Sequence, residues 1–234
     1  MKKTSYIKSA KRTLDIESKA LIKLSKNIGE DFSILCDALL SCKGKIITLG
    51  VGKSGHIAQK ISATLSSTGS PSYFIHATEA LHGDMGIISK KDNVLIFSHS
   101  GESREIIELI PSLKNIGCKI FSFTGHDESS IAKSTDINIS TEVDKEACPL
   151  DLAPTSSTTA ALALGDALAI ALLESRKFSP EDFAKSHPGG KLGRELTLKV
   201  KDIMHQGKNF PKVTSHTLVS KALVEISNKG LGIV

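Results

Sequence analysis

Aromatic residues are scarce in this chain, which has no tryptophan and only two tyrosines among 234 residues. Its formal net charge of +5 is modest, and the basic residues cluster only within residues 2–12. No series of aromatic side chains runs through that cluster to stack on bases. A solvated helix face therefore explains the cluster better than nucleic-acid binding does.

Paired cysteines and long apolar runs are also lacking. The four cysteines show no C-x-x-C spacing, and Cys36 and Cys118 stand in apolar contexts, so we expect free thiols in a reducing cytoplasm. The first residues contain no apolar stretch typical of a signal peptide. The longest apolar run, residues 160–173, includes Gly165 and Asp166, which favours a buried core helix over a membrane span. We predict a cytoplasmic protein with no membrane partner.

A strand, a glycine-rich turn and a helix follow one another in residues 45–68. The turn, 50–55, carries three glycines beside Lys53 and Ser54. The free amides and the dipole at the start of the helix favour an anion there, most plausibly a phosphate. A tight turn that binds no ligand remains an alternative.

Two nucleotide-binding motifs can be tested on this turn. The Walker A loop needs a further glycine where this chain has Ile47. The dinucleotide fingerprint G-x-G-x-x-G is matched, but it needs an acidic residue about 20 residues on, at the end of the next strand. That strand, 72–76, ends in His76 and Glu79 lies beyond it, so a dinucleotide enzyme is disfavoured.

Strands and helices alternate along most of the chain. Two helices are expected first, at 4–24 and 32–42, and Gly117 should end the helix that follows residue 103. Strands are expected at 45–49, 72–76, 94–98, 119–123 and 136–140. This alternation predicts an α/β fold with an open parallel sheet, which binds ligands at the carboxyl ends of its strands.

Hydroxyl-rich turns mark those carboxyl ends. Ser98, Ser100 and Ser103 follow one strand, and residues 155–159 precede the long apolar helix. Each cluster alone is a weak signal because serine and threonine are common helix caps. Three such turns on one rim, beside Lys53, favour a phosphorylated small molecule as the ligand.

Three titratable residues stay ambiguous on local evidence. His187 stands in a Pro-Gly loop, where a histidine is more often a surface residue than a catalyst. Glu105 lies in the first turn of a helix, where the dipole favours acids in any case, and Glu146 is equally ambiguous. The residues alone therefore predict an α/β protein that binds a phosphorylated metabolite.

Five longer motifs resemble one family. They are GVGKSGHIAQK, HGDMG, SHSGESREI, KEACPLDLAPTSSTT and SPEDFAKSHPGGKLGREL. In order and spacing they resemble the sugar isomerase (SIS) domain of D-arabinose 5-phosphate isomerases, over residues 1–205. The resemblance implies a SIS domain at 1–198, with a five-stranded parallel sheet flanked by helices in a flavodoxin-like, three-layer arrangement.

The resemblance also implies an activity and a site. Such enzymes interconvert D-ribulose 5-phosphate and D-arabinose 5-phosphate for the synthesis of Kdo in lipopolysaccharide or capsule. They are typically homotetramers whose sites are shared between subunits. The family's catalytic positions fall on Lys53, Glu105, Glu146 and His187. Its phosphate-binding positions fall on Ser54, Ser98, His99, Ser100 and Ser103, although members often carry Asn in place of His99. Further pocket candidates are Gly52, His82, Thr155, Ser156 and Ser157.

The isomerisation chemistry suits these residues. A base must remove a proton beside a carbonyl, and a positive group must hold the enediolate oxygen. We assign the proton shuttle to Glu146 or Glu105. His187 is assigned ring opening or the second proton transfer, and Lys53 is assigned stabilisation of the enediolate oxygen. No cofactor is needed, and no metal site is expected at His76 and His82.

The last residues, 199–234, resemble the start of a CBS domain. A helix is expected at 218–228 and a strand at 230–234. The chain stops inside the first CBS repeat, and so short a segment should be loosely ordered or pack on the SIS domain. A non-catalytic SIS module that binds a sugar phosphate as a regulator is the alternative function. The presence of Glu105, Glu146 and His187 favours the enzyme.

Overall fold

The computed structural model describes residues 3–188, 190 and 198–234. Lys2 of the basic cluster, and Gly189 and residues 191–196 of the last motif, lie outside the described residues, as does residue 197. The chain divides into two compact units, Met1–Ser186 and His187–Val234, and each is considered by itself.

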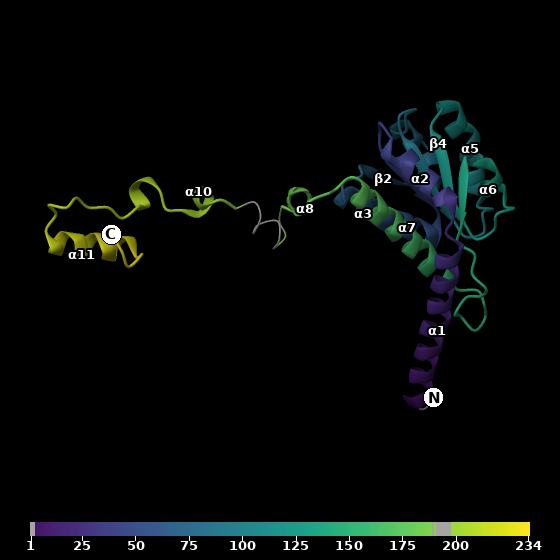
Figure 1. Cartoon of the computed structure of the whole chain (residues 1–234), viewed down its shortest axis with the longest axis horizontal. Helices are drawn as coiled ribbons and strands as arrows, with labels where there is room; N and C mark the ends of the chain where they lie inside the picture. Colours follow the sequence, from purple (N-terminus) through teal and green to yellow (C-terminus); the bar gives the residue numbers. More distant parts are fainter. Residues whose placement is uncertain (1–2, 189, 191–197) are drawn as a thin grey trace. The chain divides into compact units, whose positions relative to one another are not determined.

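A five-stranded sheet forms the centre of the first unit (Figure 1). All its neighbouring strands are parallel, in the order β2-β1-β3-β4-β5. The strands are β1 (Ile46–Gly50), β2 (Ser72–His76), β3 (Asn93–Ser98), β4 (Lys119–Thr124) and β5 (Ile137–Ser140). The apolar runs of β1, β3 and β4 are buried because helices cover both faces, whereas the edge strands β2 and β5 are only partly buried. The predicted parallel α/β sheet is confirmed, and each strand lies within a residue or two of its predicted place.

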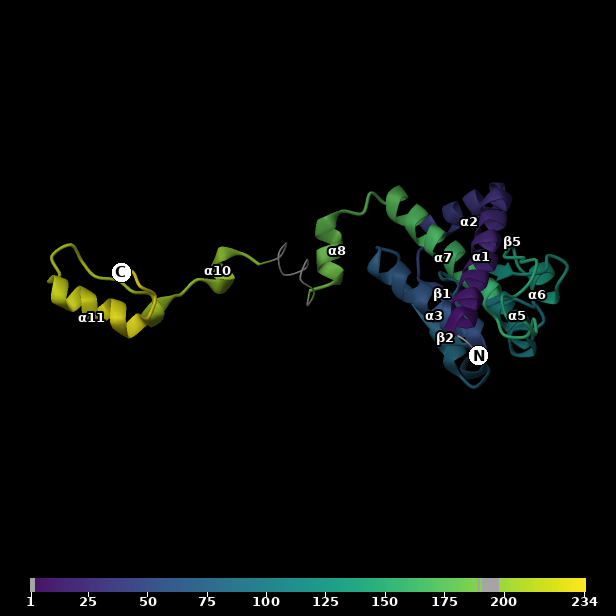
Figure 2. The same cartoon turned by 90° about the horizontal axis from the view of Figure 1, so that it is seen from below.

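Helices on the two faces of the sheet pack against separate apolar clusters. One cluster includes side chains of α2 (Glu30–Leu40), α3 (Gly52–Ser67) and α7 (Ser156–Ser175). The other includes side chains of α4 (Ala77–Leu81), α5 (Arg104–Ile116) and α6 (Ser130–Ser134). The three-layer arrangement is therefore confirmed, with α3 and α7 side by side in both views (Figure 2).

The long apolar helix is part of the core, as predicted. By length and composition alone α7 could cross a membrane, but its inner face, including Leu164, Leu168 and Leu172, is buried in the protein. Gly165 lets it approach α3 closely, because a Cβ there would lie 2.5 Å from Ile61. Such packing is typical of a core helix in a soluble fold.

The helix α1 (Lys3–Asn27) precedes the sheet and is longer than predicted. Ala20 and Leu24, near its end, are buried against the body of the first unit. Ile7 and Leu14, farther from the sheet, are exposed. Figure 1 shows this part of α1 projecting away from the sheet. An unpaired amphipathic helix of this kind leaves apolar surface open to a further partner.

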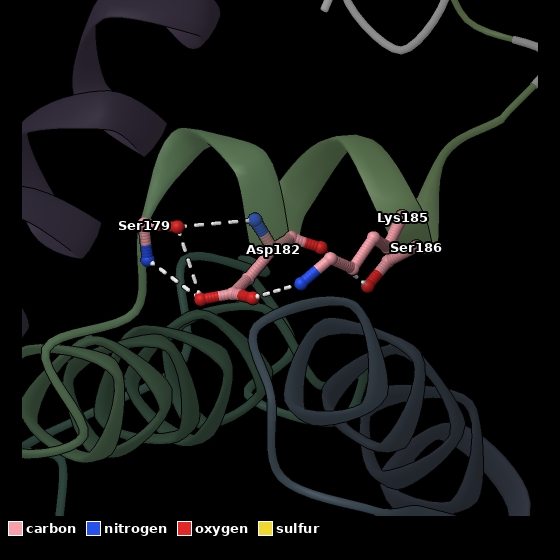
Figure 3. A network of polar contacts seen from close by, with 4 residues as sticks. All are labelled: Ser179, Asp182, Lys185 and Ser186. Carbon is pink, nitrogen blue, oxygen red and sulfur yellow. Dashed lines mark hydrogen bonds and ion pairs between the residues drawn. The ribbon is translucent and has the colours of Figure 1, made fainter. Parts of the chain in front are cut away.

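The first unit ends in a short helix that the sequence did not predict, α8 (Pro180–Ser186). Its start is fixed by a reciprocal pair: the Asp182 amide donates to the Ser179 hydroxyl, and Asp182 Oδ2 accepts from the Ser179 amide (Figure 3). Lys185 pairs with Asp182 at 2.9 Å. This is the capping-box geometry that stabilises helix starts.

The second unit contains α10 (Val200–Ile203), η2 (Gly207–Asn209) and α11 (Val219–Lys229). The helix expected at 218–228 is confirmed by α11. The strand expected at 230–234 is wrong, since the structure has only turns and bends there. Gly230 and Gly232 adopt left-handed φ values of 66° and 74°, which break an extended strand.

The order of the strands fixes where a ligand can bind. β1 lies between β2 and β3, and the helices that follow β1 and β3 pack on opposite faces of the sheet. The chain therefore diverges at the carboxyl ends of these two strands. In open α/β sheets such a switch point is the usual place for a binding site. The glycine-rich and serine-rich turns lie there.

Candidate functional site

The turn after β1 is built by glycines that approach each other closely. A Cβ on Gly50 would lie 2.8 Å from the Cα of Gly55, so the strand end and the helix start touch. Gly52 begins α3 with a left-handed φ of 56°. Lys53 is exposed, and its side chain forms no ion pair or hydrogen bond with the described residues. Its predicted contact with an anion stays a prediction.

The turn after β3 folds back on itself through its serines. The hydroxyls of Ser98 and Ser103 are 3.0 Å apart, and the Gly101 amide donates to Ser98 Oγ at 3.2 Å. Gly101 has a φ of 66°, which glycine adopts without strain. The Glu102 carboxylate accepts from the Ser130 amide at 2.8 Å and ties the turn to α6. Ser100 is exposed at its tip.

A small cavity lies between these two turns and the start of α7. It has a volume of about 40 Å³. It is lined by polar residues, namely Ser54, Ser98, His99, Thr141, Ser157 and Thr158, and by apolar residues that include Ile57, Phe97 and Phe123. Ligand pockets are typically about 300–1,000 Å³, so a sugar phosphate needs space beyond this cavity. It forms the inner end of the candidate site.

His99 is the titratable residue on the wall of the cavity. Its Nδ1 is buried and has no hydrogen-bond partner among the described residues. Burial lowers the pKa of His99; the negative charge of Glu146 opposes this, and His126 adds to it. The rings of His99 and His126 have centroids 5.7 Å apart. The free imidazole is therefore neutral near pH 7.

Glu146 anchors the start of α7. Its Oε2 accepts hydrogen bonds from the amide and the hydroxyl of Thr155, at 2.7 and 2.8 Å, and from the Ser157 amide at 3.3 Å. Burial would raise the pKa of Glu146, but the hydrogen bonds from Ser157 and Thr155 outweigh it and lower the pKa below the usual value. The residue is therefore an ionised carboxylate, and its negative charge acts on His99.

The structure thus brings Ser54, Ser98 and His99, three of the five predicted phosphate-binding residues, to the wall of one cavity. Glu146 does not line it and belongs to a separate, more open hollow with Lys145 and Cys148. Ser156, the first residue of α7, is buried and does not line the cavity. Glu105 is half-buried in the first turn of α5, and no contact among the described residues joins it to Glu146 or Lys53. The role of Glu105 stays a prediction.

Two more of the predicted site residues are histidines. His82 is exposed at the end of α4. His187 follows α8 directly and belongs to the second unit, where its carbonyl accepts a hydrogen bond from the Gly190 amide at 3.1 Å. Its contribution to the site also stays a prediction. Within the described residues, no three His, Cys, Asp or Glu side chains are grouped to hold a metal ion.

The sequence reading missed two residues that shape the site. Gly125 lies against His99, and a Cβ on it would be 2.5 Å from the imidazole. Glu102 holds the serine turn to α6. The sequence gives only a weak indication of either residue. Gly125 follows a predicted strand, as many turn glycines do. Glu102 lies in the SHSGESREI motif, whose serines already explain the turn.

Comparison with known proteins places the chain in a family. A family model, the SIS domain, matches residues 39–171. The arabinose 5-phosphate isomerase KdsD of Pseudomonas aeruginosa is 54% identical over 227 residues, which are 97% of this chain and 70% of that protein. KdsD of Escherichia coli K12 is 50% identical over 227 residues, which are 97% of this chain and 69% of that protein.

Solved structures agree with these relatives. A structure of E. coli CFT073 c3406 in complex with arabinose 5-phosphate matches with a TM-score of 0.78 and 45% identity, covering 80% of this chain and all of that one. A phosphosugar isomerase described as involved in capsule formation, from Bacteroides fragilis, matches with a TM-score of 0.76 and 36% identity, over 79% of this chain and 98% of the other. The chain belongs to the arabinose 5-phosphate isomerase family of SIS-domain proteins.

Proposed function

We propose that this chain is an isomerase that interconverts D-ribulose 5-phosphate and D-arabinose 5-phosphate, and that its product supplies Kdo synthesis. The observation that carries the proposal is the cavity between the two turns at the switch point of the sheet, lined in part by serines, in a chain whose relatives are arabinose 5-phosphate isomerases. Hydroxyls and helix-start amides can bind a phosphate without a cluster of cations. The activity then depends on acid–base groups beside that phosphate.

The phosphate is bound by the two turns at the carboxyl ends of β1 and β3. Ser54, Ser98, Ser100 and Ser103 provide hydroxyls, and the first amides of α3 and α5 point toward the same rim. His99 lies on the wall between them. Gly52 allows the turn to approach the ligand, and the start of α7, with Thr155, Ser156 and Ser157, closes the inner side.

Catalysis moves one proton between neighbouring carbons of the open-chain sugar. Glu146 is a good candidate for the base, since its pKa is low enough to keep it ionised near neutral pH. Its Oε2 is occupied by α7, so Oε1 would receive the proton. Lys53 stabilises the enediolate oxygen, while Glu105 and His187 open the ring or return the proton. His82 contributes to the outer pocket.

The complete site needs more than this cavity. We propose a cytoplasmic homotetramer in which subunits share sites, with the SIS domain at 1–198 and a CBS-like segment at 199–234. Ile7, Leu14 and Ile22 of α1 support an assembly, because they are 59%, 64% and 55% exposed. Apolar side chains exposed on one helix are typical of an interface between copies.

The decisive experiment measures conversion of D-arabinose 5-phosphate to D-ribulose 5-phosphate by the purified chain. The unphosphorylated sugar and the His187→Ala variant serve as controls. We expect turnover that needs both the phosphate and His187. If arabinose 5-phosphate raises the melting temperature but is not converted, the chain is a non-catalytic sugar-phosphate module. If it neither binds nor reacts, the proposal is wrong.

A further inference from the structure

Thr155 forms a chain of hydrogen bonds with the loop that precedes it. Its hydroxyl accepts from the Ala147 amide at 2.8 Å and donates to Glu146 Oε2 at 2.8 Å. Its own amide donates to the same carboxylate oxygen at 2.7 Å. Because an amide N–H can only donate, the direction of the chain is fixed, and the hydroxyl hydrogen points at Glu146. Hydrogen bonds arranged in such a chain polarise and strengthen one another.

The backbone of Glu146 is held from its other side by Asp151. The Asp151 carboxylate accepts from the Glu146 amide at 2.7 Å, and the Asp151 amide donates to the Cys148 carbonyl at 2.9 Å. Asp151 adopts a left-handed φ of 54°, which few residues other than glycine do. The main chain and the side chain of Glu146 are therefore both fixed before a substrate binds.

The two oxygens of the Glu146 carboxylate differ. Oε2 accepts from the amide and the hydroxyl of Thr155 and, at 3.3 Å, from the Ser157 amide. Oε1 accepts no hydrogen bond from any residue that the structure describes. Burial would raise the pKa of Glu146, but the hydrogen bonds from Ser157 and Thr155 outweigh it and lower the pKa. The group is thus an ionised carboxylate with one oxygen bound to α7 and the other unoccupied by these residues.

Glu146 lines a hollow of about 340 Å³, which is also lined by residues of α1. The other charged or titratable groups near Glu146 are Arg12 of α1, Lys145, Cys148 and Asp151 of its own loop, and His99 of the turn after β3. Hydrogen bonds from the start of α7, and no ion pair with a described residue, hold the carboxylate. Its orientation therefore depends on Thr155 more than on the charges around it.

We infer that Thr155 is a positioning residue for the isomerisation: by holding Oε2, it leaves Oε1 as the oxygen that takes the substrate's proton. This inference rests on the proposed function, because Glu146 is the base of that reaction. In the step, the C–H bond beside the carbonyl breaks, its electron pair forms the enediolate, and the proton passes to Oε1. The one hydroxyl hydrogen of Thr155 is already engaged, so Thr155 has none to donate to the sugar phosphate. It acts on turnover through Glu146.

Loss of this hydroxyl has two consequences that a stability defect alone does not produce. Glu146 loses a donor, which favours its protonated form and moves the acid limb of kcat/KM to higher pH, by about one pH unit. The carboxylate is also less firmly oriented, and a small displacement of a catalytic group can lower turnover by about 100-fold. KM should change little, because no contact with the substrate is removed.

The test measures kcat, KM and their pH profiles for arabinose 5-phosphate in Thr155→Val, Thr155→Ser and Thr68→Val. Valine matches the shape of threonine without the hydroxyl, whereas serine keeps it. Thr68→Val is the control, because the Thr68 hydroxyl donates to the Thr64 and Leu65 carbonyls at the end of α3. We expect kcat of Thr155→Val to fall by about 10- to 100-fold and the acid limb to shift, with native profiles in the other two variants. If Thr155→Val does not fold, Thr155→Cys replaces it, since a thiol is a weak donor and acceptor.

A native kcat and pH profile in Thr155→Val would overturn the inference and leave the isomerase intact. A raised KM with unchanged kcat would also overturn it, because Thr155 would then contact the substrate. Carboxyl NMR of Glu146, assigned with Glu146→Gln, needs no turnover and so separates the inference from the proposed function. If the native chain is inactive, the proposed function fails. An upward shift of the Glu146 pKa in Thr155→Val then still supports the hold of Thr155 on the carboxylate, and an unshifted pKa refutes it.

Discussion

The polar groups at the amino ends of the strands are satisfied, whereas several at the carboxyl ends are not. Before β3, the Asp92 carboxylate accepts from the Lys45 amide at 2.6 Å and from the amide and hydroxyl of Ser89 at 2.7 and 2.9 Å. Asn93 donates to the Ala38 carbonyl at 3.0 Å. At the other end, the buried side-chain atoms without partners in the described residues are His99 Nδ1, Ser156 Oγ and Ser157 Oγ.

This contrast distinguishes polar groups that hold the fold from those that await a ligand. Satisfied buried groups fix the loops that connect α2, β1 and β3, and they have no capacity left for substrate. Unpaired groups cost stability in the free protein, and a phosphate can repay that cost on binding. Glu146 does not fit either group. Its Oε2 accepts hydrogen bonds from Thr155 at the start of α7, yet the residue is predicted to be catalytic.

Glu146→Gln tests that exception and should have the largest effect. Loss of a general base typically lowers turnover by about 100- to 10,000-fold. The amide oxygen can still accept from Thr155 at the start of α7, so stability should fall by only about 1 kcal/mol, as for a weakened helix cap. Steady-state kinetics and urea denaturation measure the two effects.

Glu142→Gln is the matched control for Glu146. Glu142 is exposed and pairs with Lys23 at 3.1 Å, away from the cavity lining. We expect its turnover to remain that of the native chain. Near-normal turnover by Glu146→Gln would mean that Glu146 belongs with the structural groups, like Asp92, and that another residue supplies the base.

Asp92→Ala should damage stability and leave catalysis alone. The change removes the acceptor of the part-buried amides of Lys45 and Ser89, and loss of each such hydrogen bond costs about 1 kcal/mol. Asp136→Ala is the comparison, since Asp136 is exposed and accepts from the Ile120 amide at 2.7 Å at the start of β4. Urea denaturation should show a clearly larger loss for Asp92. A fall in turnover per folded molecule of Asp92→Ala would refute the division between the two ends.

Gly125→Ala acts at the carboxyl end through shape. Its Cβ would overlap the His99 ring, and overpacking of this kind costs about 1–3 kcal/mol, here offset partly by movement of the ring. We expect KM for arabinose 5-phosphate to rise by about tenfold, equivalent to ~1.4 kcal/mol. Gly29→Ala is the control, because a Cβ there meets nothing within 4 Å. Equal KM values for the two variants would show that the position of His99 does not matter.

Most of the fold could be predicted because its elements carry strong local signals. Strands such as Ile46–Gly50 are short apolar runs followed by glycine or serine turns. Gly117 ends α5 in the left-handed conformation expected of a helix stop. The apolar run inside α7 is recognisable as core because Gly165 and Asp166 interrupt it. Parallel order then follows from the alternation of strands and helices.

The elements that were missed or predicted wrongly lack such local signals in the sequence. The helices α4 and α8 have five and seven residues, too few to show a helical period. The strand at 230–234 was predicted wrongly because its residues are mostly apolar. A strand also needs a neighbouring strand to pair with and glycines in the extended conformation. At the site, the motifs located the hydroxyls of the rim. The fit of Gly125 to His99 depends on two loops far apart in sequence, so no spacing in the chain could reveal it.

The smallest expected effect is the pH dependence of the stability that Asp92 contributes at the amino ends of the strands. Burial would raise the pKa of Asp92, but hydrogen bonds from Lys45 and Ser89 outweigh it and lower the pKa. A carboxyl with a depressed pKa in the folded state adds stability above the pKa of the unfolded chain, about 3.9. That contribution disappears as pH falls through the lower folded value. The difference in unfolding free energy between the native chain and Asp92→Asn should therefore be constant near pH 6 and shrink below about pH 4. A difference that grows on acidification would mean that the carboxyl, not the carboxylate, holds the loop.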